Sequence, residues 1–461
     1  EYALERPAPD IVELDAEAYW RAARQAIRSV LAAPGASGAR TSGVGVTSQG
    51  ETLIVTDRAG VPLRPAIVWM DNRSVEEAAL IEREFGLDAV HRVTGQPEIT
   101  PTWTATRALW LRRHTPEVFR RAARFLLVED FLILRLTGRA ATDRGMCAST
   151  LYYDLARGDW WPEMLRFVGL SAGQLPELKR SGERAGGITN EAAAETGLPS
   201  GLPVTTAPID QISGAVGAGN LAPGMVTETT GAALALCATT DRIILDPQRR
   251  AGAYAHALPK RFALLPWTPT AGMLLRWFRD EFGGGRSYEE LLREAEGIAP
   301  GAEGLTLLPH FCGAGSPQVN PRARGVLDGL TLRHGRAHVV RALVESVAFM
   351  LRENLEMLSE LGAPVRELRC LGGTARSATW TQIKADVCRR ELLVPECEEA
   401  AALGAAMIAF VGSGICADLK EASERMVRLR RRFHPETARD DAYEAAYRRY
   451  RDLYERTRGF F

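Results

Sequence analysis

The sequence predicts an α/β protein of two domains, and three observations lead to this prediction. The chain has 461 residues, enough for about three average domains or two large ones. Residues 43–71 and 204–239 each contain short apolar runs that end in polar residues, as strands do when they deliver groups to a sheet edge. Each of these regions is followed by a mostly helical one. Two α/β domains facing one cleft account for this repeated order.

Composition excludes several classes of protein. The 57 Lys and Arg residues balance the 57 Asp and Glu residues, whereas a general nucleic-acid binder normally shows a basic excess. No run of ~18 apolar residues predicts a membrane span. The seven cysteines are scattered and lack CxxC spacing, which predicts a reducing, cytoplasmic compartment and no structural zinc.

The first domain contains two strand ends that are rich in polar groups. A helix predicted over residues 16–31 precedes the strands of residues 43–71. Amides, carboxylates and an aromatic ring at neighbouring strand ends suit a sugar or polyol, which needs several hydrogen bonds and one apolar face to stack on. Alternatively, the second group only caps the helix predicted over residues 74–85. The side chains concerned are Ser48, Gln49 and Glu51 at the first end, and Trp69, Asp71, Asn72 and Arg73 at the second. Trp103, in the loop before the next helices, is either a ligand stack or a buried aromatic.

The central stretch, residues 204–239, carries one acidic residue and one polar turn. We predict that Asp210 ends an apolar, Thr-rich strand, where it would either touch a substrate or act as a turn former or helix cap. A strand pair then folds about Thr229-Thr230-Gly231. This turn can point backbone N–H groups and hydroxyls at an anion. The domain boundary is predicted near residues 197–203, a Gly- and Pro-rich segment.

The second half contains further turns suited to a nucleotide. A helix begins at Ala271-Gly272, and a strand over residues 367–371 runs into Gly372-Gly373-Thr374 before another helix. Strand, di-glycine turn and helix in this order can bring backbone close to a phosphate, or can be a tight connection alone. The small residues of 398–410 would let another backbone or a flat ligand approach closely. The arginines from Arg428 to Arg432 are interpreted as a solvated face.

Several segments together resemble the FGGY carbohydrate kinases, which include xylulokinases, gluconokinases and glycerol kinases. The segment GVLDGLTLRHGRAHVVRALVE at 325–345 is similar to the C-terminal signature of that family. Further matches are AIVWMDNRS at 66–74, LTGRAATD at 136–143, AHALP at 255–259, LGGTARS at 371–377 and EEAAALGAA at 398–406. They follow the order of the family, so the resemblance covers essentially the whole chain.

The resemblance implies a fold of two actin-like (ribonuclease-H-like) α/β domains around a central cleft. We accordingly expect a sugar-binding N-terminal domain over 1–201, a nucleotide-binding C-terminal domain over 202–440, and a C-terminal helix over 441–461 that packs back on the N-terminal domain. Asp210 aligns with the catalytic base that removes a proton from the sugar hydroxyl. The same matching gives Gln49, Glu51, Asp71 and Trp103 as sugar ligands, and Thr229, Thr230, Gly231, Gly272, Gly373, Thr374 and Ser377 as nucleotide ligands.

Two features depart from the family pattern. The first phosphate loop of the family, an Asp-Gly-Thr on an N-terminal hairpin that also serves the metal, would lie upstream of Glu1 and has no counterpart in this sequence. We therefore expect metal positioning and activity of this polypeptide to suffer. Gly50 stands where glycerol kinases carry a substrate-binding Arg, which argues against glycerol.

The resulting hypothesis is a cytoplasmic, ATP- and Mg²⁺-dependent sugar kinase, with a ketopentose such as xylulose as the leading substrate. An aldonate such as gluconate, or another polyol, is the alternative substrate. A non-catalytic sugar or nucleotide sensor on the same fold is a rival function. An actin-like filament or chaperone ATPase is disfavoured by the sugar-binding residues predicted at the two strand ends of the first domain. The metal ligands are unknown, and a homodimer is expected by analogy only.

Overall fold

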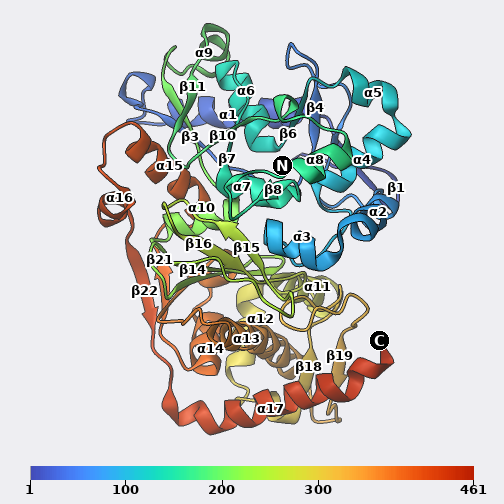
Figure 1. The fold of residues 1–461 in the computed structure, drawn as a ribbon. Coiled ribbons are helices and arrows are strands. Elements are labelled where there is room, and N and C mark those ends of the chain that lie inside the picture. The colour runs from blue at the N-terminus through green and yellow to red at the C-terminus, as the bar shows by residue number, and fades with distance from the viewer. Residues whose placement is uncertain (1) are drawn as a thin grey trace. The chain divides into compact units, whose positions relative to one another are not determined.

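The computed structural model describes residues 2–461 and divides the chain into two compact units. Unit 1 contains residues 1–219, 252–263 and 399–426, and unit 2 contains residues 220–251, 264–398 and 427–461. Both units mix helices and strands (Figure 1), as the sequence predicts. The expected boundary at residue 201 is wrong, because β12 (Pro203–Thr206) pairs with β3 (Val44–Val46) and thereby joins unit 1.

Unit 1 is built from short strands and two groups of helices. Strand β12 lies between β11 (Arg184–Gly187), which is antiparallel to it, and β3, which is parallel to it. The remaining strands pair as β1–β2–β5, β4–β6, β7–β10 and β8–β9. Their bounds are β1 Glu5–Ala8, β2 Ile11–Leu14, β4 Ile54–Thr56, β5 Ala66–Ile67, β6 Arg124–Leu126, β7 Ala141–Asp143, β8 Tyr153–Asp154, β9 Asp159–Trp160 and β10 Glu177–Lys179. Unit 1 also contains β15 (Gly252–Ala255), which takes no part in these pairs. The helices are α1 Glu17–Leu31, α2 Val75–Phe85, α3 Leu87–Thr94, α4 Thr104–His114, α5 Pro116–Arg121, α6 Val128–Thr137, α7 Arg144–Cys147, α8 Pro162–Val168, α9 Asn190–Thr196, α10 Asp210–Gly217, α15 Ala400–Gly412 and α16 Leu419–Met426.

Two hydrophobic clusters stabilise unit 1. One joins the first strands to α1, α6 and β12, with Val12, Trp20, Phe131 and Val204 among its buried members. The other lies among α2, α4 and α8 and includes Ile81, Leu111 and Met164. Trp103 is a member of this second cluster.

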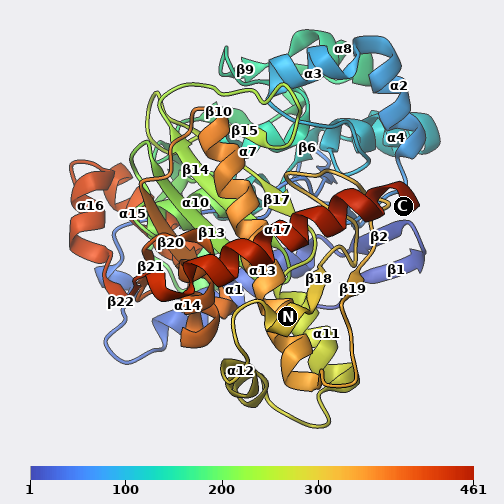
Figure 2. The same cartoon turned by 90° about the horizontal axis from the view of Figure 1, so that it is seen from below.

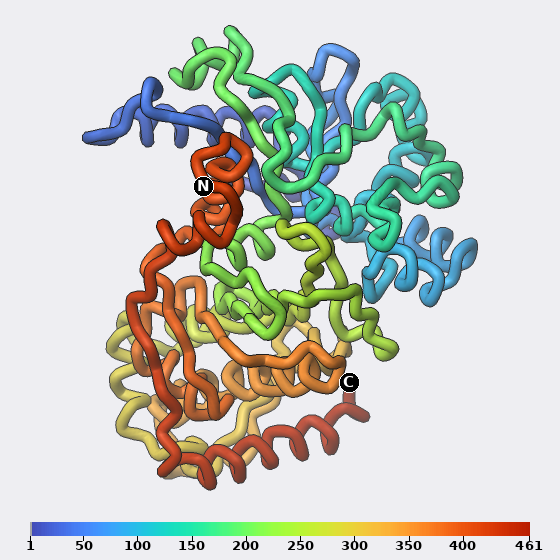
Figure 3. Tube along the Cα trace, turned by 60° about the vertical axis from the view of Figure 1, so that its left-hand side comes forward, coloured from blue at the N-terminus to red at the C-terminus, as the bar shows by residue number. Residues whose placement is uncertain are grey.

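Helix α15 returns from late in the sequence to unit 1, where it packs against α10 and β3. In Figure 3 the orange-red segment beyond residue 400 makes this return. A Cβ atom on Gly404 would lie 1.9 Å from the carbonyl oxygen of Ser213, and one on Gly45 would lie 2.2 Å from that of Ala405. The small residues predicted to allow a close approach therefore serve backbone packing, since any larger side chain would separate these elements.

Unit 2 is organised around a sheet with helices packed beside it. Its strands follow the order β14–β13–β20–β21–β22; β13, β20 and β21 are parallel, while β14 and β22 are antiparallel to their neighbours. The strands are β13 Met225–Thr230, β14 Leu234–Thr240, β17 Trp267–Thr268, β18 Thr306–Leu308, β19 Val326–Asp328, β20 Glu367–Leu371, β21 Leu392–Pro395 and β22 Leu429–Phe433. Strand β16 (Phe262–Leu265) contains one of the points at which the chain passes from unit 1 to unit 2.

Helix α13 (Arg336–Glu360) is the long helix predicted near residues 338–361, and it packs against α11 (Gly272–Phe282), α12 (Tyr288–Glu296) and α14 (Ala378–Cys388). Helix α17 (Asp440–Thr457) crosses this group and packs against α13, α14 and β18 (Figure 2). Its buried stripe is Tyr443, Tyr447, Tyr450 and Tyr454. The C-terminal helix thus belongs to unit 2, not to the N-terminal domain as expected, because these tyrosines bury their rings against unit 2 helices.

Candidate active site

Asp210 is held beside the segment Ser48–Glu51 in unit 1. It is the first residue of α10, not the last residue of a strand as predicted. Because β3 and β12 are parallel, their carboxyl ends lie at one edge of the sheet, the usual place for ligands in such folds. The backbone N–H of Asp210 donates to the carbonyl oxygen of Ser48 at 3.0 Å, and the Thr47 hydroxyl donates to that of Pro208 at 2.7 Å. The pairing of two strands therefore sets the position of Asp210.

The two carboxyl groups at this edge differ in pKa. Burial raises the pKa of Asp210 to about 6, although the N–H of Gln211 donates to its carboxylate and lowers the pKa. Burial raises the pKa of Glu51 to about 8; the negative charge of Asp210 adds to this rise and Arg107 opposes it. Between these two values Asp210 is ionised while Glu51 keeps its proton. Two carboxyl groups whose pKa values differ in this way can act as a base and as a hydrogen-bond donor, respectively.

The residues between Ser48 and Glu51 are fixed by their neighbours. The Gln49 side-chain amide donates to the Tyr19 hydroxyl at 3.2 Å and to the Thr52 hydroxyl at 2.8 Å. A Cβ atom on Gly50 would lie 2.8 Å from Ile209 and 2.8 Å from the Ser149 hydroxyl. A side chain at position 50 would therefore require its neighbours to move.

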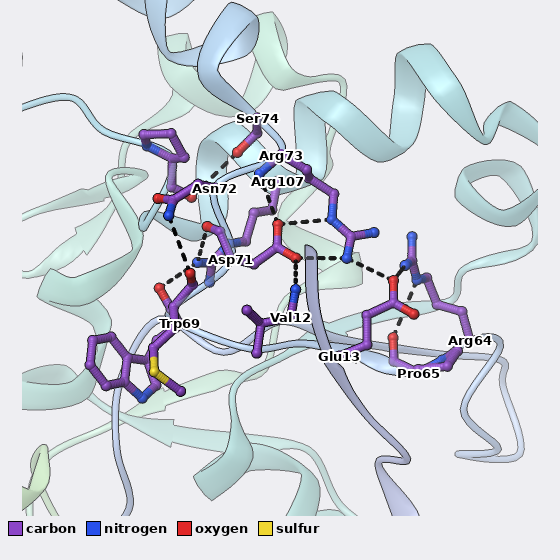
Figure 4. A network of polar contacts seen from close by, with 12 residues as sticks. Val12, Glu13, Arg64, Pro65, Trp69, Asp71, Asn72, Arg73, Ser74 and Arg107 are labelled. Atoms are coloured by element: carbon purple, nitrogen blue, oxygen red, sulfur yellow. Dashed lines mark hydrogen bonds and ion pairs between the residues drawn. The ribbon is translucent and has the colours of Figure 1, made fainter. Parts of the chain in front are cut away.

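Asp71 is a structural brace in this structure. Its exposed fraction is 0%, and its carboxylate accepts hydrogen bonds from the N–H of Val12 at 2.6 Å and from the backbone and guanidinium of Arg73 (Figure 4). Arg73 also pairs with Glu13, which in turn contacts Arg64. The carboxylate is thus fully engaged, and no surface of Asp71 is left for a sugar. Sequence reasoning could not see this because Val12 and Glu13 lie far away in the chain.

Arg107 ties the two predicted strand ends together. Its guanidinium donates to the carbonyl oxygen of Glu51 at 2.6 Å. It also donates to the carbonyl oxygens of Trp69 at 2.7 Å and Asp71 at 3.2 Å (Figure 4). Its exposed fraction is 0%. A buried guanidinium with several fixed acceptors holds backbone segments in one arrangement. The signal in the sequence is an arginine on the otherwise uncharged first two turns of α4, and it was not among the predicted site residues.

The two tryptophans differ in exposure. Trp69 is 37% exposed, so its ring is accessible. Its backbone N–H donates to the Thr52 hydroxyl at 3.1 Å. Trp103 is 6% exposed and its indole N–H donates to the carbonyl oxygen of Glu98 at 3.0 Å. The sugar-stacking role predicted for Trp103 therefore fits Trp69 better.

In unit 2 the carboxyl ends of β13 and β20 bring together the turns predicted to bind nucleotide. These strands are parallel, with Thr229 opposite Leu371, so Thr230-Gly231 and Gly372-Gly373 are neighbours. The Thr374 hydroxyl donates to the carbonyl oxygen of Thr230 at 3.2 Å. Backbone N–H groups of adjacent turns at a sheet edge are suited to binding phosphate.

The start of α11 is pressed against the first of these turns. The N–H of Gly272 donates to the carbonyl oxygen of Gly231 at 2.9 Å, and a Cβ atom at Gly272 would lie 2.3 Å from that oxygen. A helix of this length with its N-terminus at a glycine-rich turn favours an anion there. The structure thus groups Thr229, Thr230, Gly231, Gly272, Gly373 and Thr374 within unit 2.

Ser377 and Arg431 support the turn after β20. The Ser377 hydroxyl accepts a hydrogen bond from the N–H of Trp380 at 3.2 Å and caps α14. The Arg431 guanidinium donates to the carbonyl oxygens of Ala375 at 2.6 Å and Arg376 at 3.1 Å. The interpretation of residues 428–432 as a solvated face is therefore wrong for Arg431, because strand β22 points this side chain back at the turn.

Within residues 2–461, no group of three or more His, Cys, Asp or Glu side chains is arranged to hold a metal ion. Mg²⁺ in phosphoryl-transfer sites is usually held by one or two carboxylates and the phosphates of the substrate. Across the same residues, no helix combines the length and apolar character needed to cross a membrane.

Comparison with known protein families decides the identity of the fold. The N-terminal domain of the FGGY family of carbohydrate kinases matches residues 1–217, and the C-terminal domain of that family matches residues 225–413. The chain belongs to the FGGY family of carbohydrate kinases. It is accordingly a sugar phosphotransferase with the two-domain fold of that family.

Individual relatives of this carbohydrate kinase span almost its whole length. The xylulose kinase of Escherichia coli is 30% identical over 453 residues, 98% of this chain and 92% of the relative. The glycerol kinase of Trichlorobacter lovleyi is 32% identical over 465 residues, again 98% of this chain and 92% of the relative. The crystal structure of xylulose kinase from Rhodospirillum rubrum superposes with a TM-score of 0.91 at 30% identity, covering 99% of this chain and 93% of that one.

Proposed function

We propose that this carbohydrate kinase transfers the γ-phosphate of ATP to a hydroxyl of a ketopentose such as xylulose, with Asp210 as general base. The observation that carries the proposal is the arrangement of Asp210 beside the Gln49–Glu51 segment at the carboxyl ends of β3 and β12. Full-length similarity to xylulose kinases supports the choice of sugar. ATP and Mg²⁺ are the donor and metal that the family assignment favours.

In this proposal unit 1 binds the sugar and accepts one proton. Phosphoryl transfer needs an acceptor oxygen in line with the phosphate and a base that accepts its proton. The pKa of about 6 leaves Asp210 ionised at neutral pH and therefore ready to accept that proton. Glu51, which keeps its proton at neutral pH, would donate a hydrogen bond to a second hydroxyl of the sugar. The exposed ring of Trp69 would cover an apolar face of the sugar.

The chemistry asked of unit 2 is the binding of phosphate. The adjoining turns at Thr229–Gly231 and Gly373–Thr374 would bind the ATP phosphates through backbone N–H groups. The N–H groups of Gly231 and Gly272 already donate to the carbonyl oxygens of Ala233 and Gly231, so α11 would act on the phosphates through its helix dipole. Ser377 and Arg431 would act on this site by holding the turn after β20 in place.

A polyol or an aldonate is the second candidate substrate, and the similarity to a glycerol kinase supports a polyol. Glycerol itself is disfavoured because position 50 has no room for the arginine that glycerol kinases carry there. The test is sugar-dependent formation of ADP from ATP with a panel of pentuloses, polyols and aldonates. The proposal expects the highest kcat/KM with a ketopentose. Binding of a sugar without turnover would favour a sensor, and turnover of polyols alone would replace the proposed substrate.

A further inference from the structure

A lysine is buried beneath the two turns that are proposed to bind ATP. Lys384 lies on α14, and its exposed fraction is 0%. Its ammonium group is 2.7 Å from the carboxylate of Glu228 on β13, which is also 0% exposed. A buried charge is stable only with a partner and satisfied hydrogen bonds. In the sequence this lysine is the single cation of an otherwise uncharged helical segment before Asp386, and it was not among the predicted site residues.

The Lys384 ammonium joins the two turns. Besides Glu228, it donates to the Thr230 hydroxyl at 2.8 Å and to the Thr374 hydroxyl at 3.2 Å. Because an ammonium group has three N–H donors, these three oxygens satisfy it. Thr230 is the last residue of β13, whereas Thr374 lies in the turn after β20. One side chain therefore fixes two loops that are far apart in the sequence.

The same network decides which groups of the turns can meet a ligand. The Thr230 hydroxyl donates a hydrogen bond to the Glu228 carboxylate at 2.7 Å, and the Thr374 hydroxyl donates a hydrogen bond to the carbonyl oxygen of Thr230 at 3.2 Å. Both hydroxyls thus face the protein interior. The expectation from sequence that the hydroxyl of Thr230 points at an anion is replaced by a role for backbone N–H groups.

We propose that Lys384, paired with Glu228, is a positioning residue that holds the Thr230-Gly231 turn against the Gly373-Thr374 turn in the arrangement that binds the phosphates of ATP. This inference rests on the proposed binding of ATP to these turns. It assigns the network no contact with the sugar and no proton transfer, so its loss should change nucleotide affinity far more than sugar affinity.

The test is the variant Lys384→Met, which keeps the length of the side chain and removes its charge. We expect the KM for ATP to rise about tenfold or more, the range for a lost charged hydrogen-bond network. The KM for the sugar should stay near that of the wild type. Hydrogen exchange without any ligand should increase in residues 229–233 and 371–377.

A second buried ion pair in unit 2 provides a matched control. Arg341 is 2.6 Å from Glu345 on α13, and their side chains are 5% and 2% exposed. The other partners of Arg341 are the Tyr443 hydroxyl and the carbonyl oxygen of Ala295, which belong to neither turn. Arg341→Met should lower the unfolding temperature while leaving the KM for ATP unchanged. An equal rise of that KM in both variants would show a general loss of stability and overturn the positioning role.

A milder variant keeps the inference testable if Lys384→Met does not fold. Thr374→Val removes one acceptor of the ammonium with little change in shape, and it should raise the KM for ATP by a smaller factor. Where both variants fold, their effects on that KM should be less than additive, because they break one network. Unchanged exchange and unchanged affinity for ADP in these variants would overturn the inference. A wild-type chain that binds no ADP would overturn the proposed function instead, and with it the ligand assigned to the turns.

Discussion

The backbone N–H of Asp210 donates a hydrogen bond of 3.0 Å to the carbonyl oxygen of Ser48. Glu129 supports this arrangement through two further hydrogen bonds. Its N–H donates to the Ser48 hydroxyl at 3.0 Å, and its carboxylate accepts from the N–H of Ala207 at 3.1 Å. The segment that precedes Asp210 is thus fixed on two sides. The Asp210 carboxylate therefore has a defined position relative to Gln49 and Glu51.

Replacing the proposed base should stop the chemistry and spare binding. Asp210→Asn is expected to lower kcat by about 10²–10⁴-fold, the usual contribution of a general base. Affinity for the sugar, measured by calorimetry, should change little, because the amide keeps the size of the side chain. Asp440→Asn is the control, since Asp440 is likewise the first residue of a helix but lies in α17. Undiminished turnover in the Asp210 variant would remove Asp210 from the mechanism.

The pH dependence of kcat/KM should show an acidic limb near pH 6. Burial raises the pKa of Asp210 to about 6, and only the ionised form can accept a proton. Activity should therefore be lost as the pH falls through that value, rather than near 4, where an exposed aspartate titrates. Initial rates from pH 4.5 to pH 9, with enzyme stability checked at each pH, would measure the limb. A limb near pH 4 would mean that burial does not act on the reacting group.

Glu51 should produce the opposite limb. Burial raises the pKa of Glu51 to about 8, so its proton is lost as the pH rises through that value. If the protonated carboxyl donates a hydrogen bond to the sugar, kcat/KM should fall above pH 8. Glu51→Gln keeps a donor that does not titrate, and it should flatten this limb without moving the acidic one. A limb that persists in the variant belongs to another group.

A methyl group at Gly272 should disturb nucleotide binding. Its Cβ atom would lie 2.3 Å from the carbonyl oxygen of Gly231, so the turn must move. We expect Gly272→Ala to raise the KM for ATP and to lower the free energy of unfolding by about 1–3 kcal/mol, the usual cost of overpacking. Gly297→Ala is the control, because a Cβ atom there would make an ordinary contact of 3.7 Å with Glu294. An unchanged KM for ATP would separate Gly272 from the nucleotide site.

Loss of the Arg107 guanidinium should loosen the two segments of the proposed sugar site that it joins, at Glu51 and at Trp69–Asp71. Arg107→Met leaves three carbonyl oxygens without their donor, and urea unfolding should show a loss of at least about 2 kcal/mol. The KM for the sugar should rise while the KM for ATP is retained. Arg324 also donates to three carbonyl oxygens, those of Pro321, Arg322 and Ala323, but it is exposed. Arg324→Met should therefore cost little, and an equal loss in both variants would contradict the role given to Arg107.

Four features could be predicted from the sequence alone: the class of fold, the long helix near residues 338–361, the strand over residues 367–371 and the membership of the FGGY family. These features depend on local patterns of apolar and polar residues, and on short motifs whose order survives in one chain. The turns around Gly231, Gly272 and Gly373 were found for the same reason, since glycine is enriched in turns. Of these three positions, Gly272 is the one at which a Cβ atom would meet backbone, 2.3 Å from the carbonyl oxygen of Gly231.

The roles of four charged side chains depend on tertiary contacts that the sequence does not reveal. Asp71, Arg107, Arg431 and Lys384 resemble surface or ligand-binding residues in the sequence, yet each is held by partners that are distant along the chain. Whether a charge binds a ligand, braces a loop or faces water depends on those partners, because burial without them costs several kcal/mol. Strand pairing likewise depends on contacts that are distant along the chain. Residues 203–217 belong to unit 1 because β12 pairs with β3, and this pairing, not the Gly- and Pro-rich segment before β12, sets where the unit ends.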